Sequence, residues 1–386
     1  MTHLHLLLLD LDDVLLFSGG YRAALRGAVG YFGRRLGYPD VPLSDADIDV
    51  FEAFGLTAEW DSATVCVSLL LTQLWEHFPE FQAAKTGDCR PPAHHHLPLP
   101  DFQAFIAGLP AQVAGQSSAL AAAEEGLLRR SSFLSAGQRE LLQDLLGSTR
   151  LFERSPIHRL IQEFNLGSQG FTEIYGMQPS LAIESTLLMY DRPRLDDADR
   201  RLLGNWANDP DHRAVIFTNR PSTPPRGAFD TPEAELGVKA SGLPDLRIIG
   251  GGGLAWISRR RGLNSGDFLK PSPVHALAAL RLALGDTLEL ALEAAAGLAL
   301  DGTMDPDWTR LDESDLHVFE DSAKGLRSAQ AAAHVLKEHG ISLRTSLYGV
   351  SDSEPKRAAL SAAGASLFDD IQTALACVEG LEGINR

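Results

Sequence analysis

The chain has 386 residues and carries 34 Lys and Arg against 51 Asp and Glu, a formal net charge of −17 at pH 7. Its length allows two or three domains, and its content of 44% hydrophobic and 22% charged residues excludes a wholly disordered or fibrous chain. The negative charge argues against binding to nucleic acid or to an anionic membrane, because phosphate contacts need a basic surface. Only six of the basic residues are lysines, so a lysine close to a motif is informative.

The cysteines and the N-terminal segment exclude further classes. Cys66, Cys89 and Cys377 are far apart and form no Cys-x-x-Cys pair, which argues against a disulfide framework and against a zinc knuckle. The apolar run over residues 6–9 ends at Asp10 and is too short for a signal peptide or a membrane span. We therefore expect a cytoplasmic protein, and the sequence predicts nothing about its oligomeric state.

Short apolar runs, separated by helical patterns, predict parallel strands that are buried on both faces. The runs cover residues 6–9, 214–218, 246–249, 317–320, 343–348 and 366–368. The helical patterns between and after them cover residues 273–284, 284–300, 323–338, 356–363 and 371–379. This alternation predicts an α/β fold with a Rossmann-like parallel sheet.

Residues 20–205 show almost no strand-like runs. Helical patterns there cover residues 21–36, 45–54, 61–77, 138–146, 156–164, 180–189 and 196–206. We therefore predict an all-helical domain over 20–205, inserted into a core domain made of residues 1–19 and 206–386.

The first polar motif follows the first predicted strand. Asp10 and Asp12 lie where the chain leaves the sheet, and the carboxyl ends of parallel strands line a ligand crevice. Two carboxylates in that place can hold a hard cation, act as a nucleophile and transfer protons. An Asp-rich turn without a chemical role is the alternative reading of this motif.

Two further motifs are typical of anion binding. Thr218 and Asn219 end the second apolar run, where a hydroxyl and a backbone N–H suit a phosphate oxygen, although Thr also packs in strands. Lys270 precedes the helix predicted from residue 273. A lysine there opposes the helix dipole, so that an anionic ligand or nearby carboxylates should balance it.

The fourth motif ends another predicted strand. Glu320 and Asp321, placed across the crevice from Asp10, would complete an oxygen-rich Mg²⁺ site. The alternative is that these acids and Ser322 merely favour the start of the following helix.

In this order the four motifs resemble those of the haloacid-dehalogenase-like superfamily, most of whose members are Mg²⁺-dependent phosphatases. The resemblance rests on residues 10–15 (DLDDVL), 217–219 (FTN), the Lys-Pro pair at 270–271, and 319–325 (FEDSAKG). It covers residues 1–17 and about 206–386, and a helical cap inserted after the first motif is common in the family. Asp13 differs, because many relatives have Gly at that position.

The resemblance implies a role for each motif. Asp10 would attack phosphorus and Asp12 would act as acid and base. Thr218, Asn219 and Lys270 would bind the phosphoryl group. The metal ligands of Mg²⁺ would be Asp10, Glu320, Asp321 and the backbone carbonyl of Asp12.

The function implied is a phosphomonoester hydrolase that acts on a small phosphorylated metabolite through an aspartyl-phosphate. A phosphosugar mutase uses the same core residues and stays open, as does a non-catalytic binding protein on this fold. A dehalogenase of the family has no acid/base two residues after its nucleophile, and the inserted domain offers only Lys85 for the Schiff base of a phosphonate hydrolase.

Some residues outside the motifs could also meet a ligand. Arg22 follows the first motif closely and is a candidate for contact with the substrate. We interpret three other segments as structural: the histidines at 94–96 as a solvated loop, residues 190–194 as a turn between helices, and the four glycines at 250–253 as a flexible turn.

Overall fold

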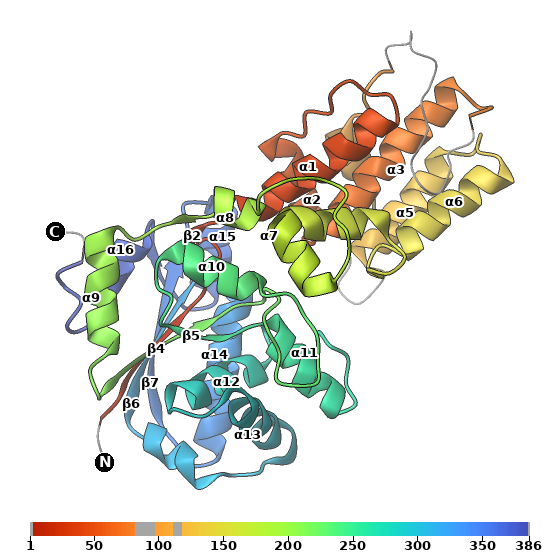
Figure 1. Ribbon diagram of the computed structural model, residues 1–386. Coiled ribbons are helices and arrows are strands. Elements are labelled where there is room, and N and C mark those ends of the chain that lie inside the picture. Colours follow the sequence, from red (N-terminus) through yellow and green to blue (C-terminus); the bar gives the residue numbers. More distant parts are fainter. Residues whose placement is uncertain (1–2, 82–96, 111–117, 385–386) are drawn as a thin grey trace. The chain divides into compact units, whose positions relative to one another are not determined.

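The computed structural model describes residues 3–81, 97–110 and 118–384. The chain forms two compact units, one made of Met1–Ser18 with Asp191–Arg386 and the other of Gly19–Tyr190 (Figure 1). Lys85, Cys89 and the histidines at 94–96 lie outside the described residues. The first unit is an α/β domain and the second consists of helices, so the predicted fold class is confirmed.

A six-stranded parallel sheet organises the first unit, in the order β5-β4-β1-β6-β7-β8. Each of the six apolar runs of the sequence is one of these strands. Their bounds are β1 His5–Leu9, β4 His212–Phe217, β5 Arg247–Ile249, β6 Ser314–Glu320, β7 Leu343–Val350 and β8 Ser366–Phe368.

Helices cover both faces of this sheet because alternate residues of each strand point to opposite sides. Leu6 and Leu8 pack in one apolar core with helices α11–α15, whereas Leu7 and Leu9 pack in another with α9, α10 and α16 (Figure 1). The bounds are α9 Asp197–Ala207, α10 Glu233–Ser241, α11 Gly251–Arg260, α12 Pro273–Ala283, α13 Leu288–Asp301, α14 Ala323–Glu338, α15 Glu354–Ala362 and α16 Ile371–Leu375, with a 3₁₀ turn at Pro306–Leu311.

A small antiparallel pair of strands, which the sequence did not predict, corrects the domain boundary. β2 (Leu16–Phe17) pairs with β3 (Arg192–Pro193), and Arg194 N donates to Leu15 O at 2.9 Å. Residues 191–205, which we expected in the helical domain, therefore belong to the α/β unit. Directly after this segment, the indole N–H of Trp206 donates to Glu379 O at 3.0 Å.

The second unit is built around α3 (Glu59–His77), which is buried along most of its length and contacts α1, α5, α6 and α7. The other helices are α1 Gly20–Arg35, α2 Asp45–Phe54, α4 Phe102–Ala107, α5 Ala119–Arg130, α6 Ala136–Gly147, α7 Pro156–Tyr175 and α8 Thr186–Tyr190. Serine side chains cap four of them, because a hydroxyl can accept the free N–H groups of the first turn. In this unit the structure thus adds α4 and α5 to the predicted helices, and the helix predicted over 180–189 begins only at Thr186.

The glycines at 250–253 are not a flexible turn, contrary to our interpretation. Gly250 is the N-cap of α11, and Gly251, Gly252 and Gly253 are buried in its first turn. A Cβ at Gly252 would lie 1.8 Å from the backbone oxygen of Ser222. Glycine is needed there so that the helix can approach this loop closely.

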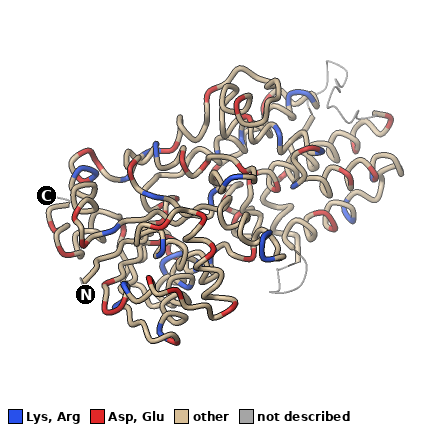
Figure 2. The backbone as a smooth tube through the Cα atoms, turned by 60° about the horizontal axis from the view of Figure 1, so that its bottom comes forward, with Lys and Arg blue, Asp and Glu red and all other residues tan. Residues whose placement is uncertain are grey.

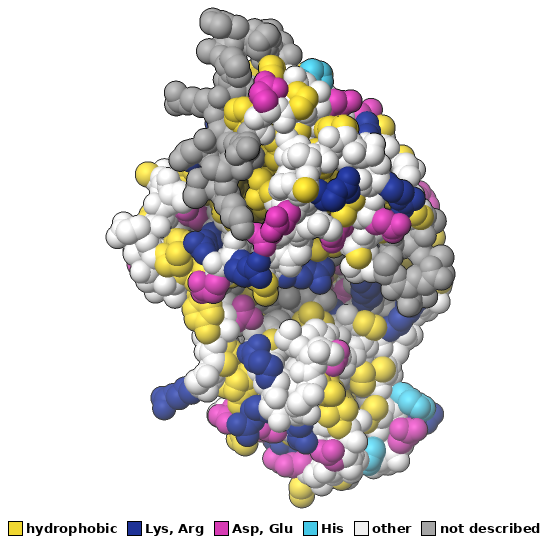
Figure 3. Space-filling model, turned by 90° about the vertical axis from the view of Figure 1, so that its right-hand side faces the viewer, with side chains coloured by type: hydrophobic (Ala, Val, Ile, Leu, Met, Phe, Trp, Pro, Cys, Tyr) yellow, Lys and Arg dark blue, Asp and Glu magenta, His cyan; other side chains and the backbone are white. Residues whose placement is uncertain are grey.

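Charged residues are spread along both units rather than gathered in one stretch (Figure 2). On the face shown in Figure 3, basic, acidic and apolar side chains are interspersed. None of the described helices is long and apolar enough to cross a membrane.

Candidate active site

The predicted motif residues of the α/β unit meet at the carboxyl edge of its sheet. Asp10 follows β1, Thr218 follows β4 and Glu320 ends β6, and these three strands are neighbours. The backbone N–H of Asp10 donates to Phe319 O at 3.0 Å, which fixes the chain where it leaves the sheet. The sheet order therefore brings together residues that are far apart in the sequence.

Lys270 lies at the centre of this group. Its Nζ donates to Asp10 Oδ1 at 2.7 Å and to Glu320 Oε1 at 2.5 Å, and it lies 3.9 Å from the centre of the Phe217 ring. The Lys270 side chain is only 4% exposed. Asn219, predicted to bind phosphate, accepts the Lys270 backbone N–H at its Oδ1 at 3.2 Å. In this structure Asn219 therefore positions the lysine.

The protonation of this group follows from burial and mutual charge. Burial and the neighbouring Glu320 raise the pKa of Asp10 to about 7, although Lys270 opposes the shift. Burial also raises the pKa of Glu320. For Lys270 burial lowers the pKa, but the two carboxylates outweigh it and the net shift is upward. The lysine is therefore a fixed positive charge beside carboxylates that it compensates only in part.

A second lysine, Lys356, which the sequence did not single out, contacts Asp321 and Asp13. Lys356 Nζ donates to Asp321 Oδ2 and, at 3.0 Å, to Asp13 Oδ2. Asp13 has a φ of 57°, the left-handed conformation that favours glycine. Burial raises the pKa of Asp321 to about 6, against the opposing charge of Lys356.

Carboxylate oxygens of Asp10, Glu320 and Asp321 lie within 4.8 Å of one another. This set consists of oxygen donors only and resembles the ligands that Mg²⁺ prefers. With Asp13 the group counts four carboxylates against two lysines. Burial, and after it the neighbouring carboxylates, raise the pKa of Asp10 and of Asp321. The residues therefore fit a hard divalent cation.

Both carboxylate oxygens of Glu320 already have partners. Oε1 accepts from Lys270, and Oε2 accepts from the Ser322 hydroxyl at 3.0 Å. The side chain is fully buried, and a Cβ at Gly325 would lie 1.7 Å from Oε1. Each of these oxygens keeps a second lone pair that could bind a metal, but Asp321 is the more accessible ligand.

Asp12 takes part in a different ion-pair network. Arg220 donates to both of its carboxylate oxygens, with Nε at 3.0 and 2.9 Å, and Ser18 Oγ donates to Oδ1 at 2.6 Å. Arg220 also contacts Asp191 Oδ2 at 2.9 Å, and both of these side chains are buried. Burial would raise the pKa of Asp12, but Arg220 and Ser18 outweigh it and lower the pKa.

Sequence reasoning missed Arg220 and Asp191, as it missed Lys356. We interpreted residues 190–194 as a solvated turn, but Asp191 is buried and precedes β3. Arg220 stands two residues after Thr218, and its backbone N–H donates to Thr218 Oγ1 at 3.2 Å. Its place directly after a strand end was the available signal, although arginine is common in this chain.

The two remaining predicted ligand-binding residues have partners in the structure. Thr218 N–H donates to Ile249 O at 2.9 Å, so its hydroxyl is the group that could donate to a phosphate oxygen. Arg22, in the helical unit, pairs with Asp49 and Glu52 at 2.7 Å each and with Asp45 at 3.4 Å. Contact between Arg22 and an anionic substrate would have to replace these ion pairs.

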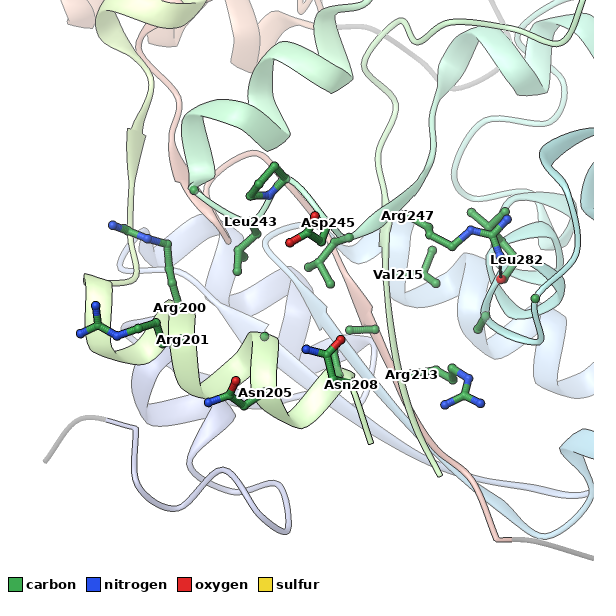
Figure 4. Close-up of a pocket in the computed structure, with 18 of the residues that line it drawn as sticks. Arg200, Arg201, Asn205, Asn208, Arg213, Val215, Leu243, Asp245, Arg247 and Leu282 are labelled. Carbon is green, nitrogen blue, oxygen red and sulfur yellow. Dashed lines mark hydrogen bonds between the residues drawn. The ribbon is translucent and has the colours of Figure 1, made fainter. Parts of the chain in front are cut away.

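A cavity of about 760 Å³ lies elsewhere in the same unit, at the start of β4 and β5 (Figure 4). Several arginines line it, but Arg247 donates to Leu282 O at 2.6 Å and Arg213 to Asp209 O at 3.0 Å. These guanidiniums bind the backbone of their own unit. None of the predicted site residues lines this cavity. The acidic cluster, which consists of Asp10, Glu320 and Asp321, is therefore the better candidate for a reaction centre.

Comparisons with known proteins support the fold alone. No protein-family model matches the chain, and no curated protein sequence matches it. The chain is similar to the X-ray structure of a Northeast Structural Genomics Consortium target, with a TM-score of 0.61 and 16% sequence identity, over 94% of this chain and 95% of the other. At that identity the likeness carries the α/β architecture with its helical region, and no activity.

Proposed function

We propose that the protein is a Mg²⁺-dependent phosphomonoester hydrolase of the haloacid-dehalogenase type, with a small phosphorylated metabolite as substrate. One observation carries the proposal: Asp10, Lys270 and Glu320 converge in direct contact from three separate parts of the chain. Thr218 and Asp321 lie at the ends of the two strands that flank β1. A nucleophile, a fixed cation, a hydroxyl and a set of metal ligands are the groups that this reaction needs.

In the first step an Asp10 carboxylate oxygen attacks phosphorus, and the bond from phosphorus to the leaving alcohol oxygen breaks. Lys270 Nζ, already beside Asp10, offsets the charge of the transferring group. The leaving oxygen takes a proton from Asp12, which acts as the acid in its protonated form. Because Arg220 favours the ionised form of Asp12, the proton transfer requires Asp12 to release Arg220 as substrate binds.

In the second step water attacks the phosphorus of the aspartyl-phosphate and gives a proton to Asp12. The bond from phosphorus to the Asp10 oxygen breaks, which frees inorganic phosphate and restores the carboxylate. The ionised form of Asp12 that Arg220 favours suits this role as general base.

Asp10, Glu320 and Asp321 would hold Mg²⁺. A bound Mg²⁺ supplies charge neutralisation on the phosphoryl oxygens. Glu320 would also orient Lys270 toward Asp10.

The proposal is tested with purified full-length protein and p-nitrophenyl phosphate. We expect release of p-nitrophenolate that needs Mg²⁺, stops with EDTA and is absent in Asp10→Asn. A screen of phosphorylated metabolites then identifies the substrate class. Absence of turnover with every compound would contradict the proposal, and transfer of the phosphoryl group to a sugar hydroxyl rather than to water would favour a mutase.

A further inference from the structure

The amino edge of the sheet, opposite the candidate active site, carries a row of polar residues. His5 of β1 is in register with His212 of β4 on one side and with Asp315 of β6 on the other, and Asp315 is in register with Arg344 of β7. His3 precedes His5 by two residues, and their rings meet edge to face at 4.9 Å. None of these residues takes part in the proposed reaction.

Three of these side chains direct ligand atoms at one another. His3 Nε2 lies 2.8 Å and His5 Nδ1 lies 3.5 Å from Asp315 Oδ2. Donor atoms that share a tetrahedral Zn²⁺ at about 2.0 Å lie roughly 3.3 Å apart. The observed separations bracket that value, and the ligand atoms of all three residues lie within 4.8 Å of one another.

We propose that His3, His5 and Asp315 form a binding site for a divalent transition-metal ion of the zinc class. Two imidazoles and one carboxylate are ligands for zinc, cobalt or nickel, whereas Mg²⁺ prefers oxygen donors. Three protein ligands leave a fourth tetrahedral position for water. The site thus differs in metal preference from the acidic cluster of Asp10, Glu320 and Asp321.

Arg344 supports this site and also competes with a metal for it. Its Nε donates at 2.6 Å to Asp315 Oδ1, the oxygen that the histidines do not contact, and so orients the carboxylate. Its terminal nitrogen also contacts the His3 ring, which a bound cation would have to displace. The Arg344 side chain is 58% exposed, so it can turn away from His3 into solvent.

This site is separate from the candidate active site. Strand β1 begins at His5, and Asp10 follows its last residue. At about 3.3 Å per residue the two residues are roughly 16 Å apart along the strand. A metal ion at the amino edge would therefore link the start of β1 to β6 without contact with the reacting groups.

The test measures Co²⁺ binding to untagged full-length protein in excess Mg²⁺, so that the acidic cluster is saturated. The background variant replaces His94, His95 and His96 by Ala, because these histidines could also bind Co²⁺. We expect one equivalent of Co²⁺ with the visible absorption of a tetrahedral complex, competed by Zn²⁺. His3→Ala and His5→Ala should each weaken binding by at least tenfold.

His334→Ala is the matched control, because His334 is exposed and its ion pair among the described residues is with the neighbouring Glu338 at 3.3 Å. It should bind Co²⁺ as tightly as the background variant. Binding that survives both His3→Ala and His5→Ala would overturn the proposal, as would absence of Co²⁺ binding in the background variant. His3 is partly exposed, so His3→Ala should fold normally, and circular dichroism checks this directly.

Discussion

The two units of the molecule bury charged groups in different ways. In the helical unit, Glu163 accepts the backbone N–H groups of Ser180 and Leu181 at 2.8 and 2.5 Å. Asp61 in the same unit pairs with Arg150, whose Nε and terminal nitrogen both donate to it. Each of these buried carboxylates has a dedicated set of donors, close to what a structural role requires.

In the α/β unit the carboxylates outnumber their partners. Asp10 and Glu320 share Lys270, while Asp13 and Asp321 share Lys356. Bringing like charges together costs stability unless a ligand or an ion offsets it. A buried charge alone therefore does not mark a site, whereas several under-compensated charges from separate strands do.

The largest difference between the units should appear when one buried carboxylate is neutralised in each. Asp10→Asn removes the proposed nucleophile, so hydrolysis of p-nitrophenyl phosphate should fall by a factor of at least ~10⁴. Thermal unfolding should show unchanged or higher stability, because the substitution removes a buried charge whose pKa is raised.

Glu163→Gln is the matched change in the helical unit. Each carboxylate oxygen of Glu163 accepts one backbone N–H, and the substitution replaces one of these oxygens by an amide NH₂ group, which is a donor. The unsatisfied backbone N–H should cost about 1–3 kcal/mol of unfolding free energy. The activity of the folded fraction should stay as in the parent chain. If Glu163→Gln abolished activity and Asp10→Asn did not, our assignment of the reaction centre would be wrong.

Asp12→Ala should separate the two proposed chemical steps. p-Nitrophenolate leaves readily without a proton, so formation of the phospho-enzyme should survive in part, but its hydrolysis needs the general base. We expect steady-state turnover to slow by ~10²–10⁴, with a burst of nearly one equivalent of p-nitrophenolate and phosphate retained on the protein. Asp10→Asn should show no burst, and wild-type steady turnover in Asp12→Ala would refute the assigned role.

A glycine pair within the α/β unit tests how tightly the acidic cluster is packed. Gly325→Ala would place a Cβ 1.7 Å from Glu320 Oε1, so Glu320 and with it Lys270 must shift. We expect a loss of about 1–3 kcal/mol in denaturant unfolding and a lower kcat. Gly204→Ala, in α9 with open space around it, should instead stabilise the unit by about 0.5–1 kcal/mol.

The sheet and the residues around Lys270 could be predicted, because their signals in the sequence are local. Buried parallel strands appear as short apolar runs, and Asp10, Thr218 and Glu320 stand directly at the ends of such runs. Lys270 was informative because lysine is rare in this chain. Which of these residues contact one another then follows from the order of the adjacent strands.

The network around Arg220 could not be predicted, because it depends on where the chain returns from the helical unit. β2 and β3 have two residues each, too few for a periodic pattern, and their pairing places Asp191 beside Arg220. Lys356 was missed for a similar reason. It lies in the first turn of α15, and only the packing of that helix brings it to Asp13 and Asp321.

The two lysines of the acidic cluster differ in burial, so their removal should have different effects. Lys356 is 44% exposed and Lys270 only 4%. An exposed ion pair contributes little to stability, so Lys356→Ala should lower the unfolding free energy by less than about 1 kcal/mol. The same change removes a cation that competes with Mg²⁺ for Asp321, so the Mg²⁺ concentration for half-maximal activity should fall about two- to fivefold at nearly constant kcat.

Lys270→Ala should instead act mainly on catalysis, because Asp10 and Glu320 then lose their shared donor and the transferring group loses its fixed charge. Its kcat should fall well beyond any change in Mg²⁺ dependence. Lys337→Ala, an exposed lysine near the end of α14, controls for loss of a surface charge and should alter neither quantity. Equal effects of Lys356→Ala and Lys270→Ala would mean that both lysines belong to the catalytic group. The ion pairs of Lys356 with Asp13 and Asp321 would then do more than balance charge.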